Sequence, residues 1–161
     1  MQLSYIDLSD AASFQTPLLA VATFRDRPPS IEGVPGAPVA LSQQVSDAVA
    51  RGDATGRTGE EVVLYGAEDG VSRVVLIGVG ESEDVDAESV RRFAGRAVRV
   101  AERLRIEAVS VSLAGFDGVE YEEVAQAAAE GCGLAAWRFD ELRADDEDDP
   151  RAEVRTAQIV G

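Results

Sequence analysis

Hydrophobic and polar positions follow a strand–helix–strand pattern between residues 71 and 115, the clearest pattern in the chain. Residues 74–77, Val-Val-Leu-Ile, form an unbroken apolar run, which is typical of a strand covered on both faces. The run breaks at Gly78-Val79-Gly80, a long amphipathic segment follows, and residues 108–113 have the pattern of a second strand. Since a helix of this length between two strands is typical of a βαβ crossover, the pattern predicts an α/β fold with at least one parallel pair.

Similar patterns divide the rest of the chain into further strands and helices. The Asp69-Gly70 pair favours a tight turn, so the strands on either side of it are expected to form a hairpin. The first strand is expected near a sheet edge, and Gly52 is expected to end the first helix. We therefore expect a single three-layer α/β/α domain over residues 1–161 with a central mixed sheet. The remaining strands are predicted at residues 2–7, 17–24, 60–65 and 153–160, and the helices at residues 38–51, 86–105 and 118–139.

The charge balance and the lengths of the apolar runs exclude several classes of partner. The chain has 15 basic and 30 acidic residues, a net charge of −15, and such a surface repels the phosphates of nucleic acids. No apolar run approaches the ~20 residues needed to cross a bilayer. A secretory signal requires basic residues near the N-terminus, and none precedes Arg25. We therefore expect no membrane contact and a cytoplasmic location. The single cysteine, Cys132, cannot form an internal disulfide, which fits a reducing compartment.

The side-chain inventory disfavours catalysis within this chain. Every basic residue is arginine, and there is no lysine or histidine, so the commonest acid–base group and the commonest amine nucleophile are both missing. We therefore predict no catalytic residue and no metal ligand. Cys132 lies on the apolar side of a predicted helix and is interpreted as part of the core. The acidic run at residues 145–149 lacks the spacing of a calcium loop and is interpreted as a linker.

Two glycine-containing segments could be mistaken for phosphate-binding motifs. Gly78-Val79-Gly80 begins like a dinucleotide fingerprint, but Glu83 occupies the third glycine position and neighbouring acids would repel a pyrophosphate. A plain turn between strand and helix is favoured there, with ligand binding at Gly78 and Gly80 kept as the alternative. Gly56-Arg57-Thr58 is not a P-loop, because arginine replaces lysine and a strand follows instead of a helix.

Four arginines form a stripe on the long helix predicted at residues 86–105. This arginine stripe consists of Arg92, Arg96, Arg99 and Arg103, spaced three or four residues apart. It has two interpretations: a solvated helix face, or a docking face for an acidic surface on this chain or on a partner.

In the last helix, Gly131 and Gly133 each cost about 1 kcal/mol relative to alanine. They indicate close packing against a neighbouring backbone or a local break.

A set of segments shares its order and spacing with one family over nearly the whole chain. The segments are Leu18-Leu19-Ala20-Val21, Gly56-Arg57-Thr58-Gly59-Glu60, residues 73–81, Arg91-Arg92, Ala94-Gly95, Gly131 and residues 134–139. Together they resemble the N-terminal domain of leucine (cytosol) aminopeptidases, a family of two-metal exopeptidases. The chain departs from the family pattern at Trp137, where a tyrosine is usual, and at Leu142-Arg143, where the family tends to have Tyr-Lys.

The resemblance implies an α/β layered domain, similar to macro domains, that precedes a catalytic domain absent from this chain. It also implies that two divalent metals, zinc or manganese, and the catalytic lysine and arginine belong to that missing domain. No cofactor is therefore expected in this chain. The implied partners are the chain's own catalytic domain and the other subunits of a homo-hexamer. By this resemblance the chain alone is not an enzyme, whereas its parent is a leucyl aminopeptidase, a metallopeptidase and hydrolase.

Two functions from different classes follow from these patterns. The first is a non-catalytic assembly or regulatory domain of a leucyl aminopeptidase-like enzyme that removes N-terminal amino acids from peptides. The alternative is a macro-domain-type module that binds ADP-ribose or a related nucleotide in the loop after Ile77. The alternative rests on Gly78 and Gly80, because ligands of open α/β sheets usually bind at the carboxyl ends of the strands.

Overall fold

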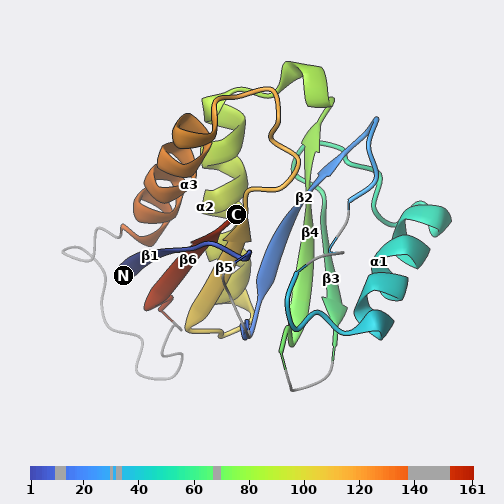
Figure 1. Cartoon of the computed structure of the whole chain (residues 1–161), viewed down its shortest axis with the longest axis horizontal. Coiled ribbons are helices and arrows are strands. Elements are labelled where there is room, and N and C mark those ends of the chain that lie inside the picture. Colours follow the sequence, from blue (N-terminus) through green and yellow to red (C-terminus); the bar gives the residue numbers. More distant parts are fainter. Residues whose placement is uncertain (10–13, 30, 32–33, 67–69, 138–152) are drawn as a thin grey trace, which may run out of the picture.

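A single mixed β-sheet organises the part of the chain that the computed structural model describes (Figure 1). The described residues are 1–9, 14–29, 31, 34–66, 70–137 and 153–161. Within them the sheet has six strands in the order β1-β6-β5-β2-β4-β3. The strands are β1 (Gln2–Ile6), β2 (Leu19–Phe24), β3 (Glu61–Tyr65), β4 (Arg73–Gly80), β5 (Ala108–Ser112) and β6 (Thr156–Val160).

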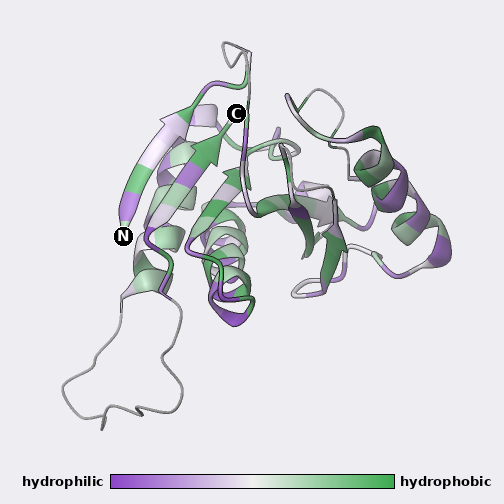
Figure 2. Cartoon of the chain, turned by 90° about the horizontal axis from the view of Figure 1, so that it is seen from below, coloured by the Kyte–Doolittle hydropathy of each residue, from purple (hydrophilic) through white to green (hydrophobic). Residues whose placement is uncertain are grey.

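Three α-helices cover this sheet from both faces, as Figures 1 and 2 show. They are α1 (Val39–Arg51), α2 (Ala87–Arg103) and α3 (Tyr121–Ala136), and a 3₁₀ turn, Ser82–Asp84, precedes α2. Alternate residues of β2 point to opposite faces: Ala20 and Ala22 pack with α2 and α3, whereas Leu19 and Val21 pack with α1. The predicted three-layer α/β/α architecture with a mixed sheet is therefore confirmed.

The strand connections follow the predicted pairing. β2 pairs in parallel with both β4 and β5, so the β4–α2–β5 connection is the βαβ crossover predicted from residues 71–115. β3 and β4 pair antiparallel, as the predicted hairpin requires. β1 pairs in parallel with β6 and lies at one edge of the sheet, the position expected for the first strand.

The helix ends show why these segments begin and stop where they do. Asp86 caps α2, because its carboxylate accepts a hydrogen bond of 2.8 Å from the backbone N–H of Ser89. Gly52 ends α1 in the left-handed conformation with a φ of 78°, as predicted from the sequence. The helices are shorter than predicted at several ends, and residues 138 and 139 of the last predicted helix lie outside the described residues.

One boundary prediction was wrong. The buried strand does not break at Gly78, because β4 continues through Gly80. The reason is that β4 stays paired with β2 as far as Gly80, while the N–H and the carbonyl of Gly78 bond to Glu60 and Gly59 on the other side. In the described part of the chain, no helix is long and apolar enough to cross a membrane.

Candidate functional site

The turn after β4 is the first candidate site, and its two glycines are closed off by the chain itself. A methyl group at Gly78 would overlap the carbonyl oxygen of Arg57. The N–H of Gly78 donates to the carbonyl of Glu60 at 2.8 Å, and the N–H of Gly80 donates to the carbonyl of Gly56 at 2.9 Å. These N–H groups are thus already paired within the chain. Ligand binding at Gly78 and Gly80 remains a prediction that their backbone geometry does not favour.

The loop that covers Gly78 is organised by a buried glycine and one carboxylate. Gly56 has a φ of 74°, and any side chain there would overlap the backbone of Phe24 at the end of β2. The carboxylate of Glu60 accepts bonds from the N–H of Thr55 at 2.5 Å, the hydroxyl of Thr55 at 2.9 Å and the N–H of Gly56 at 3.0 Å. The segment at residues 56–60, which carries part of the family resemblance, therefore joins β2, β3 and β4 structurally.

These hydrogen bonds also set the ionisation of Glu60. Partial burial by itself would raise the pKa of this carboxyl. The N–H and hydroxyl of Thr55, the N–H of Gly56 and the charge of Arg57 outweigh burial and hold the pKa below its ordinary value. Glu60 is therefore a structural carboxylate that stays ionised at neutral pH, which does not suit a general acid.

The arginine stripe is the second candidate site, and each of its members contacts a carboxylate of this chain. Arg103 and Arg96 reach across β4 to Glu61 on β3, at 2.6 and 3.6 Å. Arg92 pairs with Glu88 at 3.0 Å and Arg99 with Glu102 at 3.1 Å, both within α2. Two members of the stripe, Arg96 and Arg103, thus pair with an acidic residue of this chain, Glu61. Contact with a partner remains a prediction.

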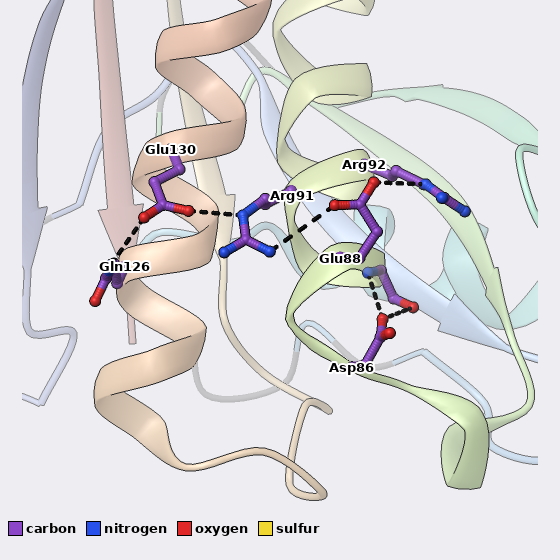
Figure 3. A network of polar contacts seen from close by, with 7 residues as sticks. Asp86, Glu88, Arg91, Arg92, Gln126 and Glu130 are labelled. Carbon is purple, nitrogen blue, oxygen red and sulfur yellow. Dashed lines mark hydrogen bonds and ion pairs between the residues drawn. The ribbon is translucent and has the colours of Figure 1, made fainter.

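A polar network joins α2 to α3 beside the stripe (Figure 3). Arg91 donates to Glu130 on α3 at 2.6 Å, and Gln126 donates to the same carboxylate at 2.8 Å. The hydrogen bond from Gln126, followed by the one from Arg91, lowers the pKa of Glu130. The sequence analysis missed this link, because Arg91 lies outside the stripe and nothing in the spacing of Glu130 identifies its partner.

A cavity of about 560 Å³ opens at the carboxyl ends of β5, β6 and β1. Its size falls in the range of small-molecule sites, and its walls are mainly apolar. Asp117, on its rim, pairs with Arg27 at 2.5 Å. Gly78 and Gly80 do not line this cavity, so the sequence analysis placed its ligand-binding alternative at a different strand end. The lining residues are Leu8, Val34, Ser112, Leu113, Ala114, Phe116, Asp117, Val119, Tyr121, Val124 and Gly161.

Tyr121 is the most polar aromatic group of this cavity. Its hydroxyl bonds to the hydroxyl of Tyr5 on β1 and lies against Gly161. Burial, followed by the hydrogen bond to Tyr5, raises the pKa of Tyr121 to about 12. The phenol therefore stays protonated at neutral pH and can serve as a hydrogen-bond donor or acceptor, but not as a base.

The described residues offer little to a metal ion. Among them, no group of three or more carboxylates, thiols or imidazoles is arranged to hold one. Cys132 is buried, and burial raises the pKa of its thiol to about 12, in agreement with its interpretation as a core residue. The acidic run at residues 145–149 lies outside the described residues.

The chain is similar in sequence to one group of proteins. The model of the N-terminal domain of the cytosol aminopeptidase family matches residues 28–146. A probable cytosol aminopeptidase of Gluconobacter oxydans is 41% identical over 101 residues, which is 62% of this chain and 19% of that protein. One from Chlorobium limicola is 32% identical over 122 residues, 67% of this chain and 24% of that protein. The chain thus matches about a fifth to a quarter of the length of these relatives.

Solved structures share the fold at lower sequence identity. A mutant of tomato leucine aminopeptidase superposes with a TM-score of 0.71 at 23% identity, covering 99% of this chain and 32% of that one. The bottromycin maturation enzyme BotP in complex with Mn gives a TM-score of 0.62 at 24% identity over 90% of this chain and 26% of that one. The macrodomain of Mycobacterium tuberculosis DarG gives 0.56 at 16% identity and matches nearly end to end, over 98% and 97% of the two chains. The fold is therefore macro-domain-like, as expected.

Proposed function

The chain belongs to the cytosol aminopeptidase family as its N-terminal domain, and from that premise we propose that it is the non-catalytic assembly or regulatory domain of a leucyl aminopeptidase-like metallopeptidase. The parent enzyme removes N-terminal amino acids from peptides, in the cytoplasm, as a homo-hexamer. The family match carries the proposal. The amino-acid composition supports the proposal, because a chain without lysine or histidine lacks the usual means of activating a nucleophile.

The residues of this chain do not fit the two divalent metals that the family implies. Structural and catalytic sites for zinc take histidine, cysteine or carboxylate ligands held within ~2.3 Å of the ion. The chain has no histidine, its one thiol is buried in the core, and no three carboxylates of the described residues are grouped to hold an ion. The metals, zinc or manganese, are therefore assigned to the catalytic domain of the parent, and no reaction step involves the present residues.

Activity of the isolated chain tests this proposal. The purified chain is incubated with leucyl anilide and zinc or manganese, beside the parent enzyme at equal molar concentration. The chain should release no aniline above the metal-only blank, while the parent turns over. Turnover by the chain that survives repurification and is lost on heat denaturation would contradict the proposal.

Ligand binding is a second candidate function, and one observation favours it. The cavity at the carboxyl ends of β5, β6 and β1 lies where open α/β sheets usually hold ligands. The nearly end-to-end match to the fold of the DarG macrodomain makes ADP-ribose the first ligand to test. Against it stands Asp117 at the rim, the one acidic residue among those that line the cavity, because its charge repels a pyrophosphate.

Calorimetric titration with ADP-ribose separates the two locations for this ligand. If the cavity binds it, Asp117→Asn should tighten binding, because the repulsion falls and Arg27 loses its partner. If the turn after β4 binds it, Thr58→Ala should weaken binding instead, since the Thr58 hydroxyl lies beside Gly80. The absence of heat at millimolar ligand would remove this function from consideration.

A further inference from the structure

The outer edge of β1 is unpaired in the part of the chain that the structure describes. β1 bonds to β6 on one side, and it is the first strand of the sheet order. Its five residues, Gln2–Ile6, include no charged residue, no proline and no bulge. Natural proteins usually protect a sheet edge with such features, because unpaired backbone groups attract another strand.

The backbone groups on this edge belong to Leu3 and Tyr5. The N–H of Gln2 and the carbonyl of Ile6 bond to β6, and so does the N–H of Leu8, which donates to Gly161 at 2.9 Å. Since backbone groups alternate in direction along a strand, those of Leu3 and Tyr5 point away from β6. Two donors and two acceptors are therefore presented outward.

The side chains of the same two residues form an exposed apolar surface. Leu3 is 42% exposed and Tyr5 is 50% exposed. They are in register with Ala157 and Ile159 of β6, which belong to the core cluster that includes α3. Leu3 and Tyr5 therefore lie on the same face of the sheet as α3. Figure 1 shows β1 at the border of the sheet, next to β6.

The opposite edge of the sheet exposes Tyr65 by 59%, but it carries a charge and a side-chain hydrogen bond to its backbone that β1 lacks in the described contacts. On β3, Glu61 carries a charge that Arg96 and Arg103 hold in place. The carbonyl of Tyr65 at the end of β3 accepts a bond of 3.0 Å from the side chain of Gln44 on α1. One edge is thus protected and the other is not, which points to β1 as a pairing surface.

We propose that β1 pairs antiparallel with β1 of a second copy of this chain, across a two-fold axis at Ser4. In that register Leu3 faces Tyr5 of the second copy and exchanges two backbone hydrogen bonds with it, and the symmetric pair exchanges two more. The sequence Gln-Leu-Ser-Tyr-Ile is therefore self-complementary in backbone direction and in side-chain type. Leucine opposite tyrosine also brings two partly exposed apolar side chains together and removes apolar surface from water.

The size and charge of this contact predict a weak, salt-dependent dimer. Two five-residue strands bury less surface than a standard stable interface, so the dissociation constant falls in the micromolar range or weaker. Each copy carries a net charge of −15, and the two copies repel each other. Added salt screens that repulsion, so the dimer tightens as ionic strength rises.

Sedimentation equilibrium of the full 161-residue chain tests the pairing with matched variants. Leu3→Asp places a charge in the contact and should weaken dimerisation at least about tenfold. Leu3→Pro removes an outward N–H that the bonds to β6 do not use, so it should also abolish the dimer while circular dichroism stays unchanged. Val39→Asp, at a residue that is 87% exposed on α1, is the control and should leave dimerisation unchanged.

Cross-linking tests the register itself. Ser4→Cys should form an intermolecular disulfide under mild oxidation, because Ser4 faces Ser4 of the second copy in a non-hydrogen-bonded pair, whose Cβ atoms lie at the close end of the cross-strand range, ~4.5 Å apart. Ser46→Cys on the exposed side of α1 should form no such disulfide. The native Cys132 is buried and should not react. Three results would overturn the proposal: a monomer at all concentrations, dimerisation of Leu3→Pro equal to that of the unmodified chain, or equal cross-linking at the two introduced cysteines.

Discussion

Gly131 lies where α3 packs closely against the backbone of α2. A methyl group there would overlap the carbonyl oxygen of Arg91 on α2, and one at Gly95 would lie 3.4 Å from the carbonyl oxygen of Gly131. Gly133, two residues later, has nothing within 4 Å of a methyl group built on it. The two glycines therefore play different roles although they lie in the same helix.

This pair of glycines supplies a matched stability test. Gly131→Ala should lower the free energy of unfolding by about 1–3 kcal/mol, because α2 and α3 must separate to accept the methyl group. Gly133→Ala should raise it by up to about 1 kcal/mol, because only the helix propensity changes. Urea denaturation of both variants and of the unmodified 161-residue chain measures these differences in the free energy of unfolding. Equal effects of the same sign would contradict the contact.

The carboxylate of Glu60 should make stability depend on pH in a definite direction. Its pKa is depressed in the folded state, so its contribution is present above the ordinary value of 4.5 and is lost as the pH falls through the folded pKa. Glu60→Gln should cost about 1–2 kcal/mol at neutral pH. The difference in stability between the unmodified chain and the variant should close as the pH falls below 4.5 and through the lowered folded pKa. A gap that stays constant from pH 7 to the acid transition would show that ionisation of Glu60 is not responsible.

At the residue scale, the sequence shows which glycines are unusual but not what each one contacts. Gly131 and Gly133 were given the same two interpretations, and the close-packing interpretation is confirmed for Gly131 alone. Gly78 was interpreted as the start of a turn, but it lies in a strand beneath Arg57. Contacts of this kind join residues distant in sequence, and spacing along the chain carries no record of them.

At the scale of elements, α2 does more than cover the sheet. Through Arg96 and Arg103 it holds Glu61 on the edge strand β3, and through Arg91 it holds Glu130 on α3. The helix thereby links the edge of the sheet to its neighbouring helix. The stripe that the sequence analysis singled out is in part an internal clamp.

Hydrogen exchange of β3 tests this clamp. Glu61→Gln removes the charge that two arginines share, so the amides of β3 should exchange faster, while those of β6 in the sheet interior keep their rates. Glu88→Gln is the control, because its ion pairs lie within α2. Faster exchange throughout the sheet, or no change at β3, would contradict a local clamp.

Element types were predictable because each has its own period of apolar residues, and the Asp69-Gly70 pair in the sequence predicted the antiparallel pairing of β3 and β4. Strand order was not. β2 lies between β4 and β5 although it precedes both by tens of residues, and β6 returns to lie between β1 and β5. Such an order depends on which long-range pairs bury most surface, and the cavity at the carboxyl ends of β5, β6 and β1 appears only once that order is known.

At the scale of the whole molecule, the chain is a layered scaffold in which several carboxylates tie neighbouring elements together. Glu60, Glu61 and Glu130 are each held by donors of this chain. This arrangement suits a domain that supports an enzyme by assembly or regulation, as proposed from its family.

The outer arginines of α2 allow a test of that assembly role. Arg92 and Arg99 have side chains that are 67% and 53% exposed and pair only locally in the described contacts, so reversing both charges spares the clamp on Glu61. If the stripe docks a neighbouring subunit, Arg92→Glu with Arg99→Glu should weaken the hexamer of the parent enzyme, as measured by light scattering. Arg51→Glu on α1 is the control. Unchanged assembly in the double variant would assign the stripe to solvent.

Deletion of residues 1–161 from the parent enzyme tests the central claim most directly. Light scattering, bound metal and turnover of leucyl anilide are measured on the same truncated sample. We predict that the truncated enzyme keeps its two metals per subunit and loses its hexameric assembly or its regulation. Loss of bound metal with the assembly intact, or a truncated enzyme indistinguishable from the parent in all three, would contradict the account.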